Sequence, residues 1–574
     1  MTKNKYTNLS KEELIQIINK LKQNKKYGLV WEDRLIKEEI VVKSQENISI
    51  LNEKKDKSIF INNESSTHML IEGDNFHSLT TLNYTHKKKI DFIYIDPPYN
   101  TGANDWRYNN DYVEKEDNFR HSKWADFMHK RILLSKNLLK DDGVLCCAID
   151  DYEIFTLLGI FKNLEASILG IVCIVNKKEG RNQKKYFTGG FEYAVFVTWG
   201  NPKIRGLLID NNEECDTCGE KLNDKKIHGT DKKGDFEWIG YHRRNPIENP
   251  EQQNRWYPIY LNKQGQISIY KSKDTVEIYP INSKGIKKIW GWDKFRFEEY
   301  ITEYPDGYKV EKNNENYKIL IKRYSTERKK PKSFWIGSRY NSYAHGTKLL
   351  KEVLNNSETM FDFPKSIHAV SDCIDLFLPE DGIVLDYFAG SGTTGHAVLE
   401  LNNKDEGNRQ FILCTNNENK ICEEVTYNRI SNVITGYGST KGINANLKYY
   451  KATFIDSNHI LSINDKDKTE LAQKAGCLLS LAENTLDEVE HTSHFQFFKS
   501  NDRNTAIYFQ EDLSELDAFV NRVEKLENPT TVYLFSWGNK SEFESMFDHI
   551  LNINIKTIPQ PILEIYKKIY YINN

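Results

Sequence analysis

Residues that can do chemistry gather first at Asp96-Pro97-Pro98-Tyr99, directly after the apolar run Ile90–Ile95. The run predicts a short buried strand, and the prolines predict its end because they lack the N–H that a sheet ladder needs. A carboxylate, a proline carbonyl and an aromatic ring then lie at the carboxyl end of a strand, where open α/β sheets bind ligands. Two acceptors beside a stacking ring suit a planar ligand with an exocyclic amino group, such as an extruded adenine or cytosine.

A glycine-rich loop, residues 389–395 (AGSGTTG), follows a second predicted strand at Gly382–Phe388. Its small residues let the backbone approach a ligand, and a helix starting near Thr393 would point N–H groups at an anion. The glycines fit the dinucleotide pattern G-x-G-x-x-G, which alone is a weak signal for an NAD dehydrogenase or for a glycine turn without a ligand. They also fit the start of a P-loop, but His396 and Ala397 replace its lysine and hydroxyl residue, which argues against ATP hydrolysis.

Taken in this order, the two motifs resemble those of the β class of DNA amino-methyltransferases, which use S-adenosylmethionine. The surrounding sequence, from about Ile71 to about Phe454, resembles the modification (Mod) subunit of type III restriction-modification systems. The segments that carry this resemblance are Asp96–Gly102, Asp141–Leu145, Ala148–Asp151, Phe361–Lys365 and Arg409–Glu418. The paired motifs are specific for methyl transfer, whereas stand-alone relatives share them with the type III branch.

The resemblance assigns a catalytic role to the first motif, Asp96, Pro97, Pro98 and Tyr99. The Asp96 carboxylate and the Pro97 carbonyl would accept the amino hydrogens of adenine N6, whose lone pair is otherwise delocalised into the ring. The carboxylate would also stabilise the positive charge that develops on N6. Tyr99 would stack on the flipped base. Asp96 favours adenine N6 over cytosine N4, which stays open as the alternative, and the step needs no metal.

The resemblance also implies a site for S-adenosylmethionine, formed by Asp74, Lys365, Asp386, Phe388, Gly390, Gly392 and Thr415. Phe388 and the glycines would contact the methionine half, with Asp386 at its amino group and Lys365 at its carboxylate. Asp74 would meet the adenine amino group. Lys365 as a solvated lysine and Asp74 as an ordinary turn residue are the alternatives. Rossmann-like sites often place an acid after the next strand for the ribose hydroxyls, where this chain has Thr415.

Length and composition are those of a multidomain globular protein. The chain has 574 residues, 39% hydrophobic and 28% charged, which predicts two to four domains. No apolar run approaches the ~20 residues of a membrane span, and the first residues lack the apolar core of a signal peptide. Nine cysteines without regular spacing predict reduced thiols and a cytoplasmic location. With a net charge of −3, any DNA affinity must come from local basic patches.

We expect a Rossmann-like α/β methyltransferase fold with circularly ordered motifs, in which the catalytic strand and the cofactor loop meet on adjacent strands of one mainly parallel sheet. A recognition region would interrupt it and a small α/β domain would follow. The predicted segments are an N-terminal helix (9–26) and linker (40–57) within 1–57, a first methyltransferase block at 58–206, the insertion at 207–335, the second block at 336–454, and a C-terminal domain at 455–574 that could contact a partner.

The insertion lacks strand–helix alternation and mixes basic residues with aromatics, which suits phosphate contacts and base stacking. The candidate DNA contacts are Arg243, Arg244, Lys288, Trp290, Arg323 and Lys330, with a solvated basic surface as the alternative. Cys215 and Cys218 form one C-x-x-C pair near His228. Because a structural zinc site commonly uses two such pairs and no second one stands nearby, we predict no metal.

Three functions are consistent with these features. The first is an adenine-N6 DNA methyltransferase of the Mod type, acting on double-stranded DNA, with a helicase-nuclease (Res) partner and a homodimer implied by the resemblance. The second is a cytosine-N4 enzyme of the same fold. The third is a non-catalytic DNA specificity subunit, which would need neither Asp96, Tyr99 nor the glycine loop.

Overall fold

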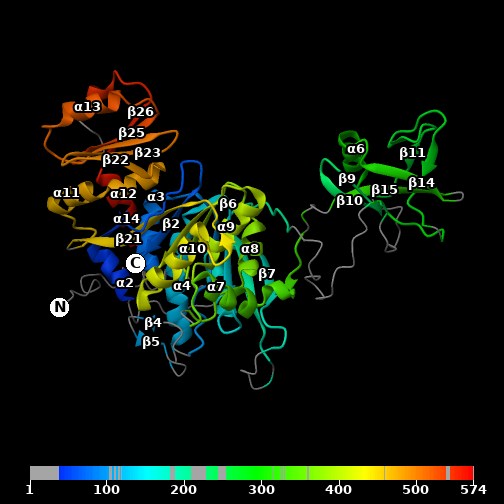
Figure 1. Cartoon of the computed structure of the whole chain (residues 1–574), viewed down its shortest axis with the longest axis horizontal. Helices are drawn as coiled ribbons and strands as arrows, with labels where there is room; N and C mark the ends of the chain where they lie inside the picture. The colour runs from blue at the N-terminus through cyan, green and yellow to red at the C-terminus, as the bar shows by residue number, and fades with distance from the viewer. Residues whose placement is uncertain are drawn as a thin grey trace, which may run out of the picture. The chain divides into compact units, whose positions relative to one another are not determined.

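The chain folds into two compact units, one formed by the residues up to Arg205 together with those from Lys332 onward, and one formed by Gly206–Pro331 (Figure 1). The computed structural model describes residues 38–572 except 103–106, 109–110, 114–116, 118, 181–185, 187, 208–227, 243–253, 283, 314–315, 325–327, 329, 359–360, 458 and 538–542. The predicted helix at 9–26, Arg243, Arg244 and the Cys215–Cys218 pair lie outside the described residues.

A ten-stranded sheet organises the first unit, in the order β1-β21-β2-β18-β17-β3-β6-β8-β7-β16. The six strands from β21 to β6 are parallel to one another, whereas β1 and β8 run antiparallel to their neighbours. The bounds are β1 (Asn47–Glu53), β21 (Asn446–Asp456), β2 (Thr67–Glu72), β18 (Gln410–Thr415), β17 (Ile383–Asp386), β3 (Ile90–Ile95), β6 (Leu139–Ile149), β8 (Phe191–Thr198), β7 (Ser167–Val175) and β16 (Phe334–Trp335). The catalytic strand β3 and the cofactor-loop strand β17 are neighbours, as predicted, with Leu385 opposite Ile93.

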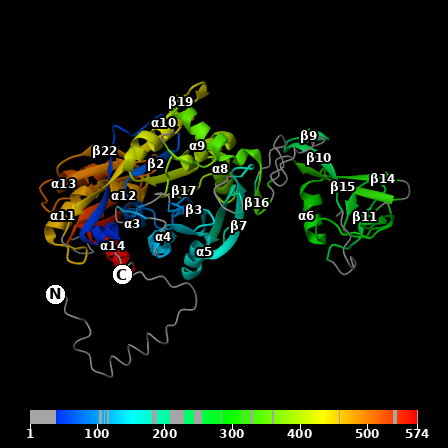
Figure 2. The same cartoon turned by 90° about the horizontal axis from the view of Figure 1, so that it is seen from below.

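Helices cover both faces of this sheet, with α3, α4 and α5 on one side and α8, α9 and α10 on the other (Figure 2). Their bounds are α3 (Asn75–Thr85), α4 (Arg120–Lys136), α5 (Ile154–Asn163), α8 (Ile367–Asp375), α9 (Thr393–Asp405) and α10 (Asn428–Thr435), and a short α7 (Leu349–Val353) precedes α8. Because both faces are covered, β3 is buried from Phe92 to Ile95 and reads as a continuous apolar run. The strand order and layering are those of a Rossmann-like methyltransferase fold, which confirms the predicted fold class.

The predicted linker at 40–57 is wrong. Residues in it form α2 (Glu39–Glu46) and β1, and β1 pairs along its whole length with β21. The charged flanks conceal the short apolar stretch of Ile48, Ile50 and Leu51, which are all buried. The side chain of Tyr566 donates a hydrogen bond to the Ser49 carbonyl over 2.6 Å, so a helix near the end of the chain also holds this strand.

The C-terminal segment builds a second sheet, β22-β23-β24-β25-β26, whose last three strands are parallel. Its elements are α11 (Asp465–Lys474), α12 (Gly476–Glu483), β22 (Asp487–His491), β23 (Phe495–Lys499), β24 (Asn504–Tyr508), α13 (Leu516–Glu524), β25 (Thr530–Phe535), β26 (Ile553–Ile558) and α14 (Gln560–Ile572). Leu478, Tyr533 and Tyr566 share one apolar core with Leu82 of α3, so this segment packs on the catalytic sheet.

The first helical stretch of this segment is divided into α11 and α12, which are separated by Ala475. Gly476 begins α12 where the chain passes β23, and a β-carbon at this position would lie 2.1 Å from the Gln496 side-chain oxygen. The break redirects α12, so that Leu478 and Leu479 enter the core.

The second unit is rich in β structure. One sheet has the order β14-β15-β10-β9 and another the order β12-β11-β13, and α6 follows β13 and precedes β14 in sequence. The bounds are β9 (Gly229–Asp231), β10 (Gly234–Gly240), β11 (Ile259–Leu261), β12 (Ile267–Ser268), β13 (Val276–Ile278), α6 (Lys294–Glu303), β14 (Tyr308–Asn313) and β15 (Asn316–Tyr324). The unit has its own apolar core, which includes Tyr241, Ile259 and Phe297.

Candidate active site

The carboxyl ends of β2, β18, β17, β3 and β6 meet along one edge of the sheet and carry the predicted site residues. The catalytic motif leaves β3 directly after Ile95. The Trp124 indole on α4 donates a 2.7 Å hydrogen bond to the Pro98 carbonyl, which fixes the turn between the two prolines and Tyr99. Asn100 follows with a left-handed φ of 57°, is buried, and donates to Glu153. The motif is therefore held by buried contacts on both sides.

Lys365 lies at the centre of the charged groups of this motif. Its ammonium is 2.9 Å from an Asp96 carboxylate oxygen and 3.1 Å from Glu192 of β8, and it also donates to the Tyr99 hydroxyl. Tyr99 in turn donates to the same Asp96 oxygen over 2.9 Å. The Lys365 side chain is only 11% exposed and that of Glu192 9% exposed. These four groups form one closed network, which we call the Lys365 network.

Burial sets the protonation chemistry of the Lys365 network. Desolvation raises the pKa of Asp96, and the neighbouring Lys365 ammonium works against that rise while Glu192 adds to it. For Lys365 itself, desolvation lowers the pKa, but the two carboxylates outweigh it and the pKa is raised above its usual range. Burial and the nearby Asp96 charge raise the pKa of Tyr99, which stays a neutral phenol. Lys365 is thus the cation that favours the ionised form of Asp96.

The glycine loop after β17 adopts a backbone that side chains would disfavour. Gly390 and Gly392 have φ values of 50° and 76°, and α9 starts at Thr393 with Gly392 as its N-cap. A β-carbon on Gly390 would lie 3.1 Å from the Phe361 ring, and one on Gly392 would lie 3.2 Å from the Thr426 methyl group. The Thr426 hydroxyl also donates to the Gly390 carbonyl over 2.6 Å. The loop is a rigid cradle of bare backbone at a helix N-terminus, as predicted.

Asp386 ends β17 and supports this loop from below. One carboxylate oxygen accepts from the Phe388 N–H over 2.9 Å and the other from the Thr394 hydroxyl over 2.6 Å. The residue is 2% exposed, and burial raises its pKa to about 7, with a smaller contribution from the Asp96 charge. The side chain of Phe388 packs against Phe127 of α4. Asp386 therefore changes its charge near neutral pH.

The other predicted cofactor residues also lie at this edge. Asp74 caps α3 by accepting from the Phe76 N–H over 2.7 Å. Thr415 ends β18, and its carbonyl accepts from the Gly73 N–H over 2.9 Å, which ties it to the Asp74 turn. Lys365 differs from the expectation, since it binds Asp96 and Glu192 of the catalytic motif.

The predicted DNA-contact residues differ in their exposure to solvent. Trp290 is 2% exposed, stacks on Tyr241 and donates to the Tyr257 carbonyl, so it is a core residue and its prediction as a base-stacking ring is wrong. Lys288 is 5% exposed, so its prediction as a surface phosphate contact is also wrong. Arg323 forms an ion pair with Glu237 across the sheet, and Lys330 is exposed. In the second unit, basic residues next to aromatic residues therefore lie in the core as well as on the surface.

Three residues of the site were missed by sequence reasoning. Glu192 is an acid inside an otherwise apolar strand, which is a signal for a buried functional carboxylate. Trp124 carries no such signal, because an aromatic residue on a helix face usually marks core. Arg131 of α4 is fully buried, donates to the Asn75 side chain over 2.6 Å and pairs with Glu38, and thereby braces the turn that holds Asp74.

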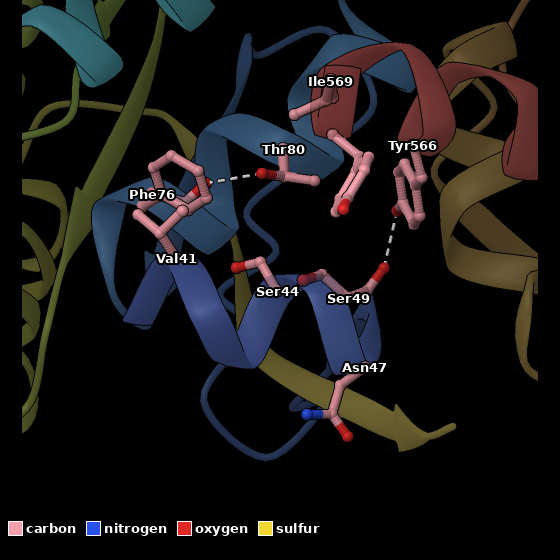
Figure 3. Close-up of a pocket in the computed structure, with 9 residues that line it drawn as sticks. Val41, Ser44, Asn47, Ser49, Phe76, Thr80, Tyr566 and Ile569 are labelled. Atoms are coloured by element: carbon pink, nitrogen blue, oxygen red, sulfur yellow. Dashed lines mark hydrogen bonds between the residues drawn. The ribbon is translucent and has the colours of Figure 1, made fainter. Parts of the chain in front are cut away.

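A small cavity of about 20 Å³ lies between α2, β1, α3 and α14 (Figure 3). Its lining includes the hydroxyls of Ser44, Ser49 and Thr80 and the ring of Tyr566. This volume suits a single water molecule, and none of the predicted site residues lines it. Within the described ranges, no group of three or more His, Cys, Asp or Glu side chains could hold a metal ion, and no helix is long and apolar enough to cross a membrane.

Proteins named as methyltransferases or as modification subunits are similar to this chain. The Type II methyltransferase M.KpnI of Klebsiella pneumoniae is 29% identical over 363 residues, which cover 62% of this chain and 82% of that protein. The type III restriction-modification enzyme EcoPI Mod subunit of Escherichia phage P1 is 27% identical over 394 residues. That match covers 62% of this chain and 58% of the Mod subunit, so the chain matches little more than half of that relative's length.

Among solved structures, the M1.HpyAVI–SAM complex is 13% identical, covers 63% of this chain and 99% of its own, and has a TM-score of 0.27. Such a loose likeness adds nothing to the strand order described above. The family described as DNA methylase (N6_N4_Mtase) matches residues 90–428, a range that includes both the Asp96 motif and the glycine loop. Since this match spans more than half of its length, the chain belongs to the DNA methylase family.

Proposed function

We propose that this protein transfers a methyl group from S-adenosylmethionine to adenine N6 of a base flipped out of double-stranded DNA. The observation that carries the proposal is the meeting of Asp96 and the glycine loop at the ends of the adjacent strands β3 and β17. Motifs some 290 residues apart in sequence, Asp96 and Gly390, thereby form one site. The Mod subunits among the relatives support the reading of the chain as the modification subunit of a type III system.

The residues at the sheet edge fit S-adenosylmethionine, because Gly390 and Gly392 leave bare backbone where a side chain would clash, and the buried Asp386 can answer a cationic amino group. When bound, this cofactor supplies a methyl group on a positively charged sulfur, which takes back the bonding electron pair as the methyl leaves. Phe388 and the glycine loop would hold its methionine half, and Asp74 and Thr415 would lie toward its nucleoside.

The chain's own residues would then activate the nucleophile. Asp96 and the Pro97 carbonyl accept the two N6 hydrogens, which draws the nitrogen lone pair out of the ring plane and toward the methyl group. Tyr99 stacks on the base and keeps it out of the duplex. After the N–C bond forms, N6 carries a positive charge that the Asp96 carboxylate stabilises until a proton leaves to this carboxylate or to water.

Recognition and assembly follow from the same proposal. The second unit, Gly206–Pro331, lies in sequence between the two motif blocks and is the region to which we assign target recognition, with exposed Lys330 among the phosphate contacts. A helicase-nuclease (Res) partner and a homodimer belong to the type III reading, and the C-terminal segment from residue 455 is the proposed partner contact.

A cytosine-N4 enzyme is the second candidate, because the designation of the matching family covers both amino positions. The test is transfer of labelled methyl from S-adenosylmethionine to unmethylated bacterial DNA, followed by separation of the product nucleosides by mass spectrometry. N6-methyladenine is the expected product. N4-methylcytosine would make the second candidate the function, and folded protein that binds the cofactor without methylating any DNA would indicate a specificity subunit.

A further inference from the structure

The Lys365 network contains two charges that the methyl-transfer step does not itself call for. Besides Asp96 it holds a second carboxylate, Glu192, and one ammonium, all drawn from separate elements of the fold. Glu192 comes from the antiparallel strand β8, and Lys365 comes from the turn before α8. Burying Lys365 and Glu192 beside the partly exposed Asp96 is costly unless each charge is paired, and here the ammonium lies within 3.1 Å of both carboxylates. Such a closed arrangement points to a role in setting the position and charge of the Asp96 carboxylate.

Glu192 has two contacts that hold Lys365 and Tyr99 at once. Its carboxylate is 3.1 Å from the Lys365 ammonium and accepts a 3.3 Å hydrogen bond from the Tyr99 hydroxyl. Lys365 also lies over the Tyr99 ring, 4.6 Å from its centroid. The acceptor for the amino group and the ring for the base are thus tied to the same ammonium, so a shift of Lys365 would disturb both.

The groups that face Asp96 differ in their effect on its charge. Negative or ionisable groups approach it from β8, β17, β6 and its own strand and turn, namely Glu192, Asp386, Cys147, Tyr94 and Tyr99. Lys365 is the cation that acts on it. A protonated Asp96 would offer a hydrogen where N6 needs an acceptor, so the reaction requires the ionised form.

We infer that Lys365, anchored by Glu192, is a positioning residue that keeps Asp96 an ionised acceptor aligned with the Tyr99 ring. This inference rests on the proposed function for its consequence in catalysis, but the protonation of Asp96 can be measured without any turnover. It also differs from the expectation that Lys365 binds the cofactor carboxylate, and the two roles predict different results for the same variants.

The direct test follows the carbon-13 carboxyl resonance of Asp96 through a pH titration, with the signal assigned by its loss in Asp96→Asn. In Lys365→Met the titration midpoint should rise by about one to three pH units, because the ammonium that favours the ionised form of Asp96 is gone. In Glu192→Gln it should fall, since a carboxylate that opposes ionisation is removed while the amide still accepts from Lys365. Lys365→Arg should remain near the wild type, and Lys404→Met, at an exposed lysine of α9, should match it.

The kinetic test uses methyl transfer under the same series of pH values. The acidic limb of kcat should move up in Lys365→Met and down in Glu192→Gln, with KM for DNA and cofactor changed by less than about threefold. A network with only a structural role would move neither limb. Asp96 titration midpoints that do not move, or that move in the same direction in both variants, would overturn the inference. An unmoved Asp96 midpoint in Lys365→Met together with a cofactor affinity lowered more than about tenfold would also overturn it, and would place Lys365 at the cofactor.

Failure of the proposed function gives a different pattern. In that case the wild type transfers no methyl group to any DNA, yet the Asp96 midpoint still responds to Lys365 and Glu192 with opposite signs. A wild type that methylates DNA while the two midpoints stay in place contradicts this inference alone.

Discussion

The burial of Asp386 predicts that cofactor binding depends on pH near neutrality, above the range in which exposed carboxylates titrate. The residue is 2% exposed, and burial raises its pKa to about 7 in the free protein. A ligand ammonium next to Asp386 favours the carboxylate, so binding at acid pH must first remove the proton. The affinity should therefore be full above pH 7 and fall as the pH drops below it. Asp386→Asn, which keeps the shape but cannot ionise, should abolish this dependence.

The magnitude follows from the fraction of Asp386 that is ionised. With a pKa of about 7, only about 3% of the carboxyl is ionised at pH 5.5, against about three quarters at pH 7.5. The dissociation constant of S-adenosylhomocysteine, whose amino group stays protonated over this range, should rise about 25-fold between pH 7.5 and pH 5.5, or about 1.9 kcal/mol. Isothermal titration at several pH values measures this, with Asp96→Asn as the control that keeps the slope. A flat wild-type profile, or an unchanged slope in Asp386→Asn, would refute the reasoning.

Three further predictions concern groups that hold the site in place. Gly392→Ala should weaken cofactor binding at least tenfold in the same titration. Its φ of 76° costs a residue with a side chain about 1–2 kcal/mol, and the new methyl group would press on Thr426. The control is Gly265→Ala, at a φ of 84° with open space around it, which should leave binding unchanged. Trp124→Phe should lower kcat about tenfold with little change in cofactor affinity. The substitution leaves the Pro98 carbonyl without its indole donor, at a cost of about 1–3 kcal/mol. An unchanged kcat would count against a role of Trp124 in holding the catalytic turn. Arg131→Met should lower the free energy of unfolding in urea by about 3–5 kcal/mol, because Glu38 loses its buried partner. Adding Glu38→Gln should restore part of this loss. A double variant no more stable than Arg131→Met would contradict the explanation.

The catalytic core was predictable from sequence because its signals are local. Two prolines after an apolar run end β3, and a cluster of glycines marks the loop after β17, so both motifs could be found in short stretches of residues, whereas their adjacency was implied by the resemblance. Strand β1 escaped prediction because its stability comes from pairing with β21, some 400 residues away, and no local pattern reports such a partner.

The contacts around the motifs were less predictable for the same reason. Lys365 was expected at the cofactor because the resemblance implies that role, but its ammonium reaches Glu192 on a strand of the first block. Trp290 matched the composition of a nucleic-acid surface, yet the same aromatic and basic residues supply the stacked core of the second unit. Burial of one face or another depends on tertiary packing, which composition does not record.

The central claim is that Asp96 and the glycine loop act as one site for methyl transfer to an amino group. It is tested most directly by comparing the wild type with Asp96→Ala for both cofactor affinity and transfer of labelled methyl to DNA. We expect the variant to fold, to bind the cofactor within about threefold of the wild type, and to transfer at a rate lower by at least about a thousandfold. Retained transfer in the folded variant would contradict the assignment of Asp96 and with it the account of the site.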